Sequence, residues 1–143
     1  RAKDGKVHVL YNRCPHRGAM VCGDRSGNTG DQFRCSYHAW TFHHDGKLRN
    51  IPMMESGYQG TRVNKDSPEL CVKRAARVAA DLPMAPGTPV YCAAFGDQAA
   101  GMIANATQAP EGHWEALVVA QIEAITQQDL RLGEPSGPAL RFP

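Results

Sequence analysis

The segment that decides the fold runs from residue 7 to residue 42 and reads VHVLYNRCPHRGAMVCGDRSGNTGDQFRCSYHAWTF. It contains two short elements of one kind, Cys14-Pro15-His16-Arg17-Gly18 and Cys35-Ser36-Tyr37-His38. The histidine follows the cysteine by two positions in the first element and by three in the second, and 18 residues separate His16 from Cys35. Such matched pairs indicate a metal centre built from two loops.

Strand-forming residues lead into both elements. Residues 7–11 are rich in β-branched or aromatic side chains and run into the first cysteine, and a second short strand is expected over 31–35, ending at Cys35. Alternation over residues 40–42, followed by the hairpin signal Asp45-Gly46, predicts a return strand over 48–51. We therefore expect a mainly β fold, a small antiparallel sandwich with the two loops at one tip.

The four loop residues suit a [2Fe–2S] cluster with mixed ligands. We expect Cys14 and Cys35 to bind an inner iron and His16 and His38 to bind an outer, more exposed one. Two neutral imidazoles in place of two thiolates leave less negative charge on the cluster and raise its reduction potential. In this interpretation Gly18 gives amide donors room to approach the cluster sulfurs. The chemistry is the transfer of single electrons.

Two other interpretations use the same residues. Two cysteines and two histidines can hold zinc, but paired zinc ligands are usually separated by two or more residues, which the pair Cys14 and His16 does not match. Chance placement of structural residues is the second alternative; only six histidines occur in the 143 residues, so two matched pairs after strand-like segments are an uncommon coincidence.

The segment from residue 7 to about residue 58 resembles Rieske domains, and more narrowly the large (α) subunit of bacterial aromatic-ring-hydroxylating dioxygenases. The runs Cys14-Pro15-His16-Arg17-Gly18-Ala19 and Cys35-Ser36-Tyr37-His38-Ala39-Trp40-Thr41-Phe42 carry this resemblance. Ala39 stands where the family commonly has glycine. Free-standing Rieske ferredoxins usually lack the equivalents of Arg17 and Trp40, so a stand-alone ferredoxin electron carrier is the alternative function.

The resemblance implies an N-terminal fragment of a larger cytoplasmic enzyme that dihydroxylates an aromatic compound during aromatic catabolism. It implies electrons from NAD(P)H through a reductase or ferredoxin, neighbouring α subunits, and in many cases a β subunit. It also implies a mononuclear Fe(II) held by two histidines and a carboxylate. Only His113 follows His44 in the sequence, so we expect this catalytic iron site to be missing here and assign no catalytic residue.

The resemblance also bears on the reduction potential. Rieske proteins of respiratory complexes add a disulfide between the loops, at the positions of Ala19 and Tyr37, and hydroxyl donors near the sulfurs, at the positions of Trp40 and Phe42. None of these groups is present. Because fewer donors stabilise the reduced cluster less, we expect a potential at the low end of the Rieske range.

Beyond the resemblance, composition divides the chain. We assign residues 1–82 to a partial Rieske domain and 83–143 to an Ala/Pro/Gly-rich extension, which a divergent tail, a foreign segment or a shifted reading frame would explain. A helix is predicted over 113–131, ending at Gly133 and followed by a loose tail. The stripe that predicts it consists of Trp114, Leu117, Val118, Ile122 and Ile125.

Composition and charge exclude several function classes. The net charge of +2 and the absence of a Lys/Arg run of five argue against nucleic acid as a partner, and no apolar stretch is long enough to predict a membrane span. Five cysteines are an odd number, so we expect Cys22, Cys71 and Cys92 to be plain thiols rather than parts of a disulfide framework. His43 and His44 are expected in the hairpin.

Overall fold

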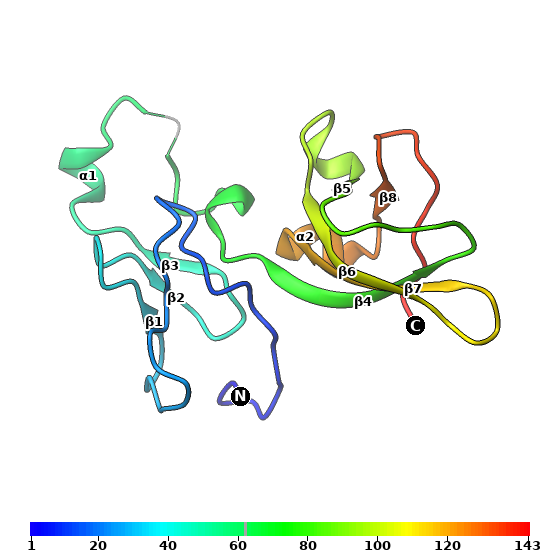
Figure 1. Cartoon of the computed structure of the whole chain (residues 1–143). Helices are drawn as coiled ribbons and strands as arrows, with labels where there is room; N and C mark the ends of the chain where they lie inside the picture. Colours follow the sequence, from blue (N-terminus) through cyan, green and yellow to red (C-terminus); the bar gives the residue numbers. More distant parts are fainter. Residues whose placement is uncertain (62) are drawn as a thin grey trace. The chain divides into compact units, whose positions relative to one another are not determined.

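The computed structural model describes residues 1–61 and 63–143. These residues form two compact units, Arg1–Val72 and Lys73–Pro143, which are described separately (Figure 1). Both units are built on antiparallel sheets and carry little helix, so the expected mainly β fold is confirmed. No helix in the described part of the chain has the length and apolar character needed to cross a membrane.

The first unit is organised around a three-stranded sheet with the order β1-β2-β3. Its strands are β1 (Phe33–Arg34), β2 (Thr41–Phe42) and β3 (Leu48–Asn50). The strand predicted before Cys35, the one around 40–42 and the return strand are thereby confirmed. The hairpin turn is present as well: the His43 N–H donates to the Lys47 carbonyl at 2.8 Å, and the Asp45 carboxylate accepts from the Lys47 N–H.

The strand predicted over residues 7–11 is not formed. Within the described part of the chain this segment contributes a single bridge residue, Leu10. Val7 and Val9 are 70% and 60% exposed. The strand-forming side chains of residues 7–11 were therefore not sufficient to form a strand. A strand also needs a neighbour that completes its hydrogen bonds and covers its apolar face.

The core of the first unit lies beneath the two cysteine elements. Its buried members are Cys14, Cys35, Trp40, Phe42, Leu48, Ile51 and Val72. The connection after β3 carries only the short helix α1 (Met54–Gly57) and a 3-10 turn, η1 (Pro68–Leu70). The two cysteines are therefore part of the packed interior as well as of the loops.

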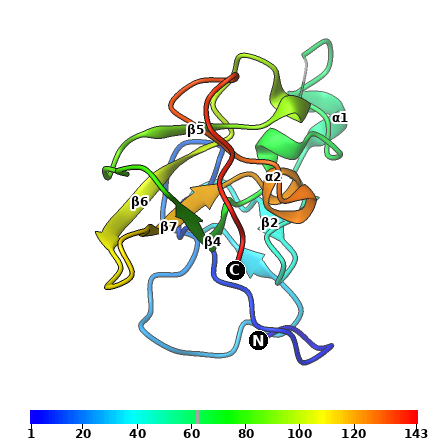
Figure 2. The ribbon, with the colours of Figure 1, turned by 90° about the vertical axis from the view of Figure 1, so that its right-hand side faces the viewer.

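The second unit is built on a five-stranded sheet with the order β4-β7-β6-β5-β8, and its strands pair antiparallel among the described residues (Figure 2). The strands are β4 (Arg74–Ala80), β5 (Pro89–Tyr91), β6 (Gly101–Gln108), β7 (Trp114–Ala120) and β8 (Arg131–Leu132). The helical elements are η2 (Ala93–Phe95) and α2 (Ile122–Gln127). Strand β4 belongs here because it pairs with β7 over its whole length, whereas the composition-based boundary after residue 82 groups it with the first unit.

The prediction of one helix over 113–131 is wrong. Residues 114–120 form strand β7, which is hydrogen-bonded to β4 on one side and β6 on the other, and only Ile122–Gln127 is helical. The predicted stop at Gly133 instead follows strand β8. The side chains of Ala116 and Val118 are buried while Leu117 is 45% exposed, which is the alternation of a strand.

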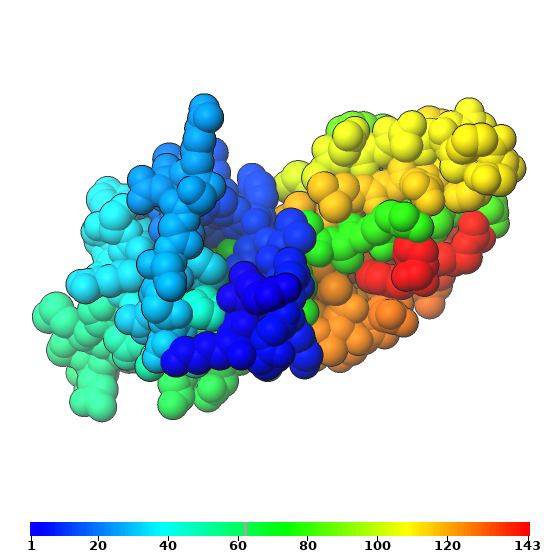
Figure 3. Space-filling view, turned by 90° about the horizontal axis from the view of Figure 1, so that it is seen from below, coloured from blue at the N-terminus to red at the C-terminus, as the bar shows by residue number. Residues whose placement is uncertain are grey.

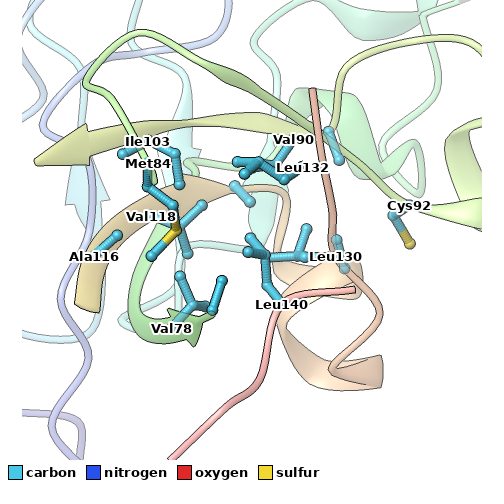
Figure 4. Close-up of a cluster of buried hydrophobic side chains, with 14 residues drawn as sticks. Val78, Met84, Val90, Cys92, Ile103, Ala116, Val118, Leu130, Leu132 and Leu140 are labelled. Atoms are coloured by element: carbon cyan, nitrogen blue, oxygen red, sulfur yellow. The ribbon is translucent and has the colours of Figure 1, made fainter. Parts of the chain in front are cut away.

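A single apolar cluster holds the second unit together (Figure 4). It includes Val78 from β4, Val90 from β5, Ile103 from β6 and Val118 from β7, all 0% exposed. Residues 83–143 therefore share one apolar core with strand β4.

The last residues are docked rather than loose. The Arg141 N–H and carbonyl form a bridge with Ala79, and Leu140 is buried. The Arg141 guanidinium also pairs with the Asp81 carboxylate, with Nη2 at 2.7 Å from Oδ1. In the space-filling view the red C-terminal segment lies on the green segment that contains β4 (Figure 3).

Candidate metal centre

The two cysteine elements fold into loops with the same hydrogen bonds. In the first loop the Cys14 N–H donates to the Ala19 carbonyl at 2.8 Å, and the Gly18 N–H donates to the Cys14 carbonyl at 2.8 Å. Each bond closes a tight turn around the cysteine.

The second loop repeats this pattern at the same offsets. The Cys35 N–H donates to the Trp40 carbonyl at 2.9 Å, and the Ala39 N–H donates to the Cys35 carbonyl at 3.0 Å. The two cysteines therefore sit in equivalent backbone frames, although the histidine follows after two residues in one loop and after three in the other.

Both loops need a left-handed residue four positions after the cysteine. Gly18 has φ 71° and Ala39 has φ 58°. No described protein atom lies within 4 Å of where a Cβ would stand on Gly18. The positive φ, rather than crowding by protein atoms, therefore explains why glycine stands at position 18. The spacing of the motif alone did not reveal this reason.

The loops bring the four predicted ligands into two layers. The thiols of Cys14 and Cys35 are each 2% exposed and interact with one another. The His16 ring is half-buried and the His38 side chain is exposed, and their ring centroids lie 4.6 Å apart, edge to face. Thiols inside and imidazoles outside is the arrangement that we expected of an inner and an outer iron.

Burial favours the neutral forms of Cys14 and His16. Burial raises the pKa of the Cys14 thiol to about 11, and the neighbouring Cys35 thiol acts in the same direction, while the His16 and Arg17 amides oppose it. Burial, with smaller effects of His38 and Arg17, lowers the pKa of His16. A neutral imidazole is the form that binds a metal, and iron would supply the positive charge that the thiolates need. The donor set and the two amide N–H groups directed at Cys14 therefore fit an iron–sulfur cluster.

Across residues 1–61 and 63–143, no group of three or more Cys, His, Asp or Glu side chains converges so that it could hold one metal ion. In a [2Fe–2S] cluster with mixed ligands, each iron takes two protein ligands.

Aromatic side chains cover both histidines. The Trp40 ring stacks on the His16 ring with centroids 4.7 Å apart and planes 3° from parallel. The Tyr37 ring lies 3.9 Å from the His38 ring at 41°. The contact between Trp40 and His16 was not predicted from the sequence. The available signal for it was the position of Trp40, two residues after the second histidine.

Two polar side chains support the first loop, and sequence reasoning missed both. The Asn12 amide oxygen accepts from the N–H groups of Val21 and Cys22, at 3.1 and 2.9 Å, and its amide nitrogen donates to the Cys22 carbonyl at 2.7 Å. The Arg13 guanidinium donates to the Gly18 carbonyl at 2.9 Å. An asparagine just before a cysteine loop was the available signal, because its side chain satisfies backbone groups well.

The remaining cysteines and the histidines of the hairpin were also candidates in the sequence. Cys22, Cys71 and Cys92 are free thiols, as predicted, and burial raises the pKa of each. His43 and His44 flank the hairpin turn, where the His44 ring contacts Phe33 at 5.3 Å.

Arg17 and His113 have surface environments. Arg17 is exposed and forms no ion pair with any residue in the described part of the chain. His113, in the second unit, lies 3.9 Å from the Glu111 carboxylate and 3.7 Å from that of Glu115.

Comparison with known families gives a match over the first half of the chain. Residues 1–74 match the Rieske [2Fe-2S] domain. The match ends close to the boundary of the first compact unit after Val72 and includes both loops.

Curated relatives match the same region. The chain is 43% identical over 60 residues to the N,N-dimethyl phenylurea N-demethylase subunit alpha of Sphingobium sp. (strain YBL2), covering 42% of this chain and 13% of that protein. It is 39% identical over 62 residues to the biphenyl 2,3-dioxygenase subunit alpha of Rhodococcus jostii (strain RHA1), covering 43% and 13%. It is 38% identical over 69 residues to the salicylate 5-hydroxylase large oxygenase component of Ralstonia sp, covering 48% and 16%. The matched segment is thus a small part of each relative's length.

Proposed function

The chain belongs to the Rieske [2Fe-2S] domain family, and from this premise we propose that its first unit transfers single electrons through a [2Fe–2S] cluster. Cys14 and Cys35 would bind one iron, and His16 and His38 the other. The observation that carries this proposal is the pair of equivalent loops, which bury two thiols together and hold two imidazole rings 4.6 Å apart.

In this proposal the two cysteines hold the cluster in the interior, and the histidines bring it to the surface. When bound, the cluster supplies one-electron oxidation and reduction. Burial of Cys14 and Cys35 keeps water from the thiolate ligands, and the exposed edge of His38 gives a partner protein the shortest approach. Electrons would therefore enter and leave on the histidine side.

We place the reduction potential at the low end of the Rieske range, which spans roughly −150 to +300 mV. Trp40 and Phe42 offer no hydroxyl to the cluster sulfurs, and Phe42 is fully buried in the core. A reductive titration that gave a midpoint well above zero would count against this part of the proposal.

We further propose that the parent protein is the α subunit of a ring-hydroxylating oxygenase. The relatives, which are named as dioxygenase, demethylase and hydroxylase components, support this assignment. Such a parent would be cytoplasmic and receive electrons from NAD(P)H through a reductase or ferredoxin. It would pass them to a mononuclear Fe(II), outside this chain, for dihydroxylation of an aromatic compound, with neighbouring α subunits and a β subunit as partners.

Reconstitution of the whole chain tests the cluster directly. The protein is incubated anaerobically with ferrous iron and sulfide, and we expect two irons and two sulfides per chain with the visible absorption and EPR signal of a mixed-ligand cluster. Cys35→Ser and His38→Ala should abolish the signal, because each removes a ligand. Cys71→Ser, which removes a half-buried thiol outside the loops, should leave it intact. A colourless protein that binds one zinc per chain after anaerobic purification would overturn the proposal.

A further inference from the structure

Side chains of the two loops meet across the candidate metal centre: the Cys14 thiol meets that of Cys35, and the His16 ring meets that of His38. A further contact has parallel rings. Trp40 comes from the second loop, yet its ring lies flat on the ring of His16 from the first, at 4.7 Å and 3°. Trp40 is only 2% exposed, and the Tyr58 ring meets it edge to face at 6.1 Å and 72°. The indole is therefore held by the core on its other sides.

Other links between the loops are few. All five cysteines are free, so no disulfide ties the loops together. Within the described residues, the loop hydrogen bonds run from Cys14 to Ala19 and from Cys35 to Trp40, and no backbone hydrogen bond joins residues 14–19 to residues 35–40. The loops are thus held to one another by packing of their side chains.

Within the described residues, no hydrogen bond orients the His16 ring. Histidines that bind metals generally donate their second ring N–H to a carboxylate or carbonyl, which fixes the plane of the ring. No hydrogen bond from the His16 ring to another protein group occurs among residues 1–61 and 63–143. The second torsion of a histidine side chain is broad, so without such a bond only packing selects the ring plane.

We propose that Trp40 is a positioning residue: its indole face clamps the first loop to the second and fixes the plane of the His16 ring for iron. The ligand part of this inference rests on the proposed function. Parallel aromatic pairs contribute beyond the area that they bury, and here the partner is buried and rigid. In this proposal the packing of Trp40 on His16 holds the two loops together without a disulfide between them.

The simpler role for Trp40 is that of an ordinary core side chain. Both roles predict that Trp40→Leu destabilises the first unit, because a large buried ring is lost. Only the positioning role predicts a change in the environment of the His16 ring and in the electronic properties of the assembled cluster. The experiment therefore has one arm without the cluster and one with it.

The first arm uses NMR on the whole chain without iron, with labelled histidine. A ring stacked on indole experiences its ring current, so the His16 ring protons should be shifted upfield in the native chain. The shift should be lost in Trp40→Leu and reduced in Trp40→Phe, whose smaller ring keeps an aromatic face. Trp114→Leu, which removes the tryptophan of the second unit, should leave the His16 shift unchanged. A native His16 ring without an upfield shift would overturn the inference, whatever the cluster does.

The second arm uses the reconstituted chain. We expect Trp40→Leu to lose its cluster about tenfold faster than the native chain, which corresponds to about 1.4 kcal/mol in the barrier. The EPR signal of Trp40→Leu should also broaden and shift, while Trp40→Phe stays close to native in both readouts. An EPR spectrum and a midpoint potential indistinguishable from native in Trp40→Leu would show that Trp40 is only a core residue.

Two further outcomes separate this inference from the proposed function. If the native chain shows the upfield His16 shift but never takes up iron, the proposed function fails while the clamp between the loops stands. If Trp40→Leu does not fold, Trp40→Phe decides: a His16 ring shift that is unchanged from native in that variant overturns the positioning role.

Discussion

Gly18 and Ala39 occupy the same place in the two cysteine loops. Each lies four residues after its cysteine, donates its N–H to the carbonyl of that cysteine, and has a positive φ, 71° for Gly18 and 58° for Ala39. Glycine adopts this conformation without strain, whereas an alanine side chain crowds the following carbonyl. The second loop therefore carries strain that the first does not.

Ala39→Gly should stabilise the first unit. The left-handed conformation costs an L-residue about 1–2 kcal/mol. Glycine removes this cost, but its greater freedom in the unfolded chain disfavours folding by about 0.5–1 kcal/mol. We expect a net gain of about 0.5–1 kcal/mol in the free energy of unfolding, measured by urea denaturation. Ala19→Gly is the control, because Ala19 is not among the residues with positive φ. A loss of stability in Ala39→Gly as large as that in Ala19→Gly would contradict the strain.

Thr41→Val should also stabilise the first unit. The Thr41 hydroxyl is buried in the central strand and has no hydrogen-bond partner among the residues that the structure describes. Valine keeps the shape and removes the unpaired group, so we expect a gain of about 1 kcal/mol in the free energy of unfolding. Thr61→Val should do the opposite, since the Thr61 hydroxyl donates to the Tyr58 carbonyl at 2.6 Å. Equal effects of the two substitutions on the urea midpoint would rule out this explanation.

Gly101→Ala should destabilise the second unit. Gly101 in β6 pairs with Ala120 in the neighbouring antiparallel strand β7, and a Cβ at Gly101 would overlap the carbonyl oxygen of Val119 and the Cα of Ala120. Both are backbone atoms of a central strand and cannot move aside. We expect a loss of roughly 1–3 kcal/mol, typical of overpacking, in thermal unfolding followed by amide NMR signals of β7. Gly27→Ala is the control, because open space surrounds that position.

The ion pair of Asp81 with Arg141 should make the second unit sensitive to acid. The hydrogen-bonded Arg141 guanidinium lowers the pKa of the Asp81 carboxyl below its ordinary value of 3.8. A lowered pKa in the folded state means that the stabilisation is complete above 3.8 and is lost as the pH falls through the lowered pKa. Asp81→Asn should therefore be less stable than the native chain at neutral pH and equal to it in strong acid.

Two comparisons check this assignment. High salt should reduce the difference between native and Asp81→Asn, because both groups are exposed to solvent. Asp97→Asn, at an exposed position outside the pair, should show no such acid-dependent difference. A gap between native and Asp81→Asn that stayed constant from neutral pH to strong acid would exclude the ion pair as its source.

The loops, the hairpin and the iron chemistry were predictable because each depends on residues close together in the sequence. Cysteine and histidine at close spacing define a donor set, and Asp45 and Gly46 favour a tight turn in almost any context. The expected strands around 31–35, 40–42 and 48–51 formed because they border these local features. The parts of the site that follow from residue type and short spacing were therefore visible in the sequence.

In two other segments, local sequence could not predict the secondary structure. The stripe from Trp114 to Ile125 satisfies helical spacing, yet Trp114–Ala120 is a strand because β4 and β6 supply hydrogen bonds on both sides. Residues 7–11 show the reverse case, since they have strand-forming side chains but only Leu10 is bridged in the described part of the chain. In both segments the presence or absence of partner strands, and not local propensity, determined the outcome.

By itself the sequence indicated the donor set of the proposed centre: two thiols and two imidazoles on two short loops, with a glycine where the first loop turns. Only the tertiary structure decided that the loops are equivalent, that Ala39 is strained, and that Trp40 lies on His16. These relationships join segments separated by many residues, and they arise when a common core fixes both segments at once. Residue type can specify what a site binds, but contacts distant in sequence determine how firmly its ligands are held.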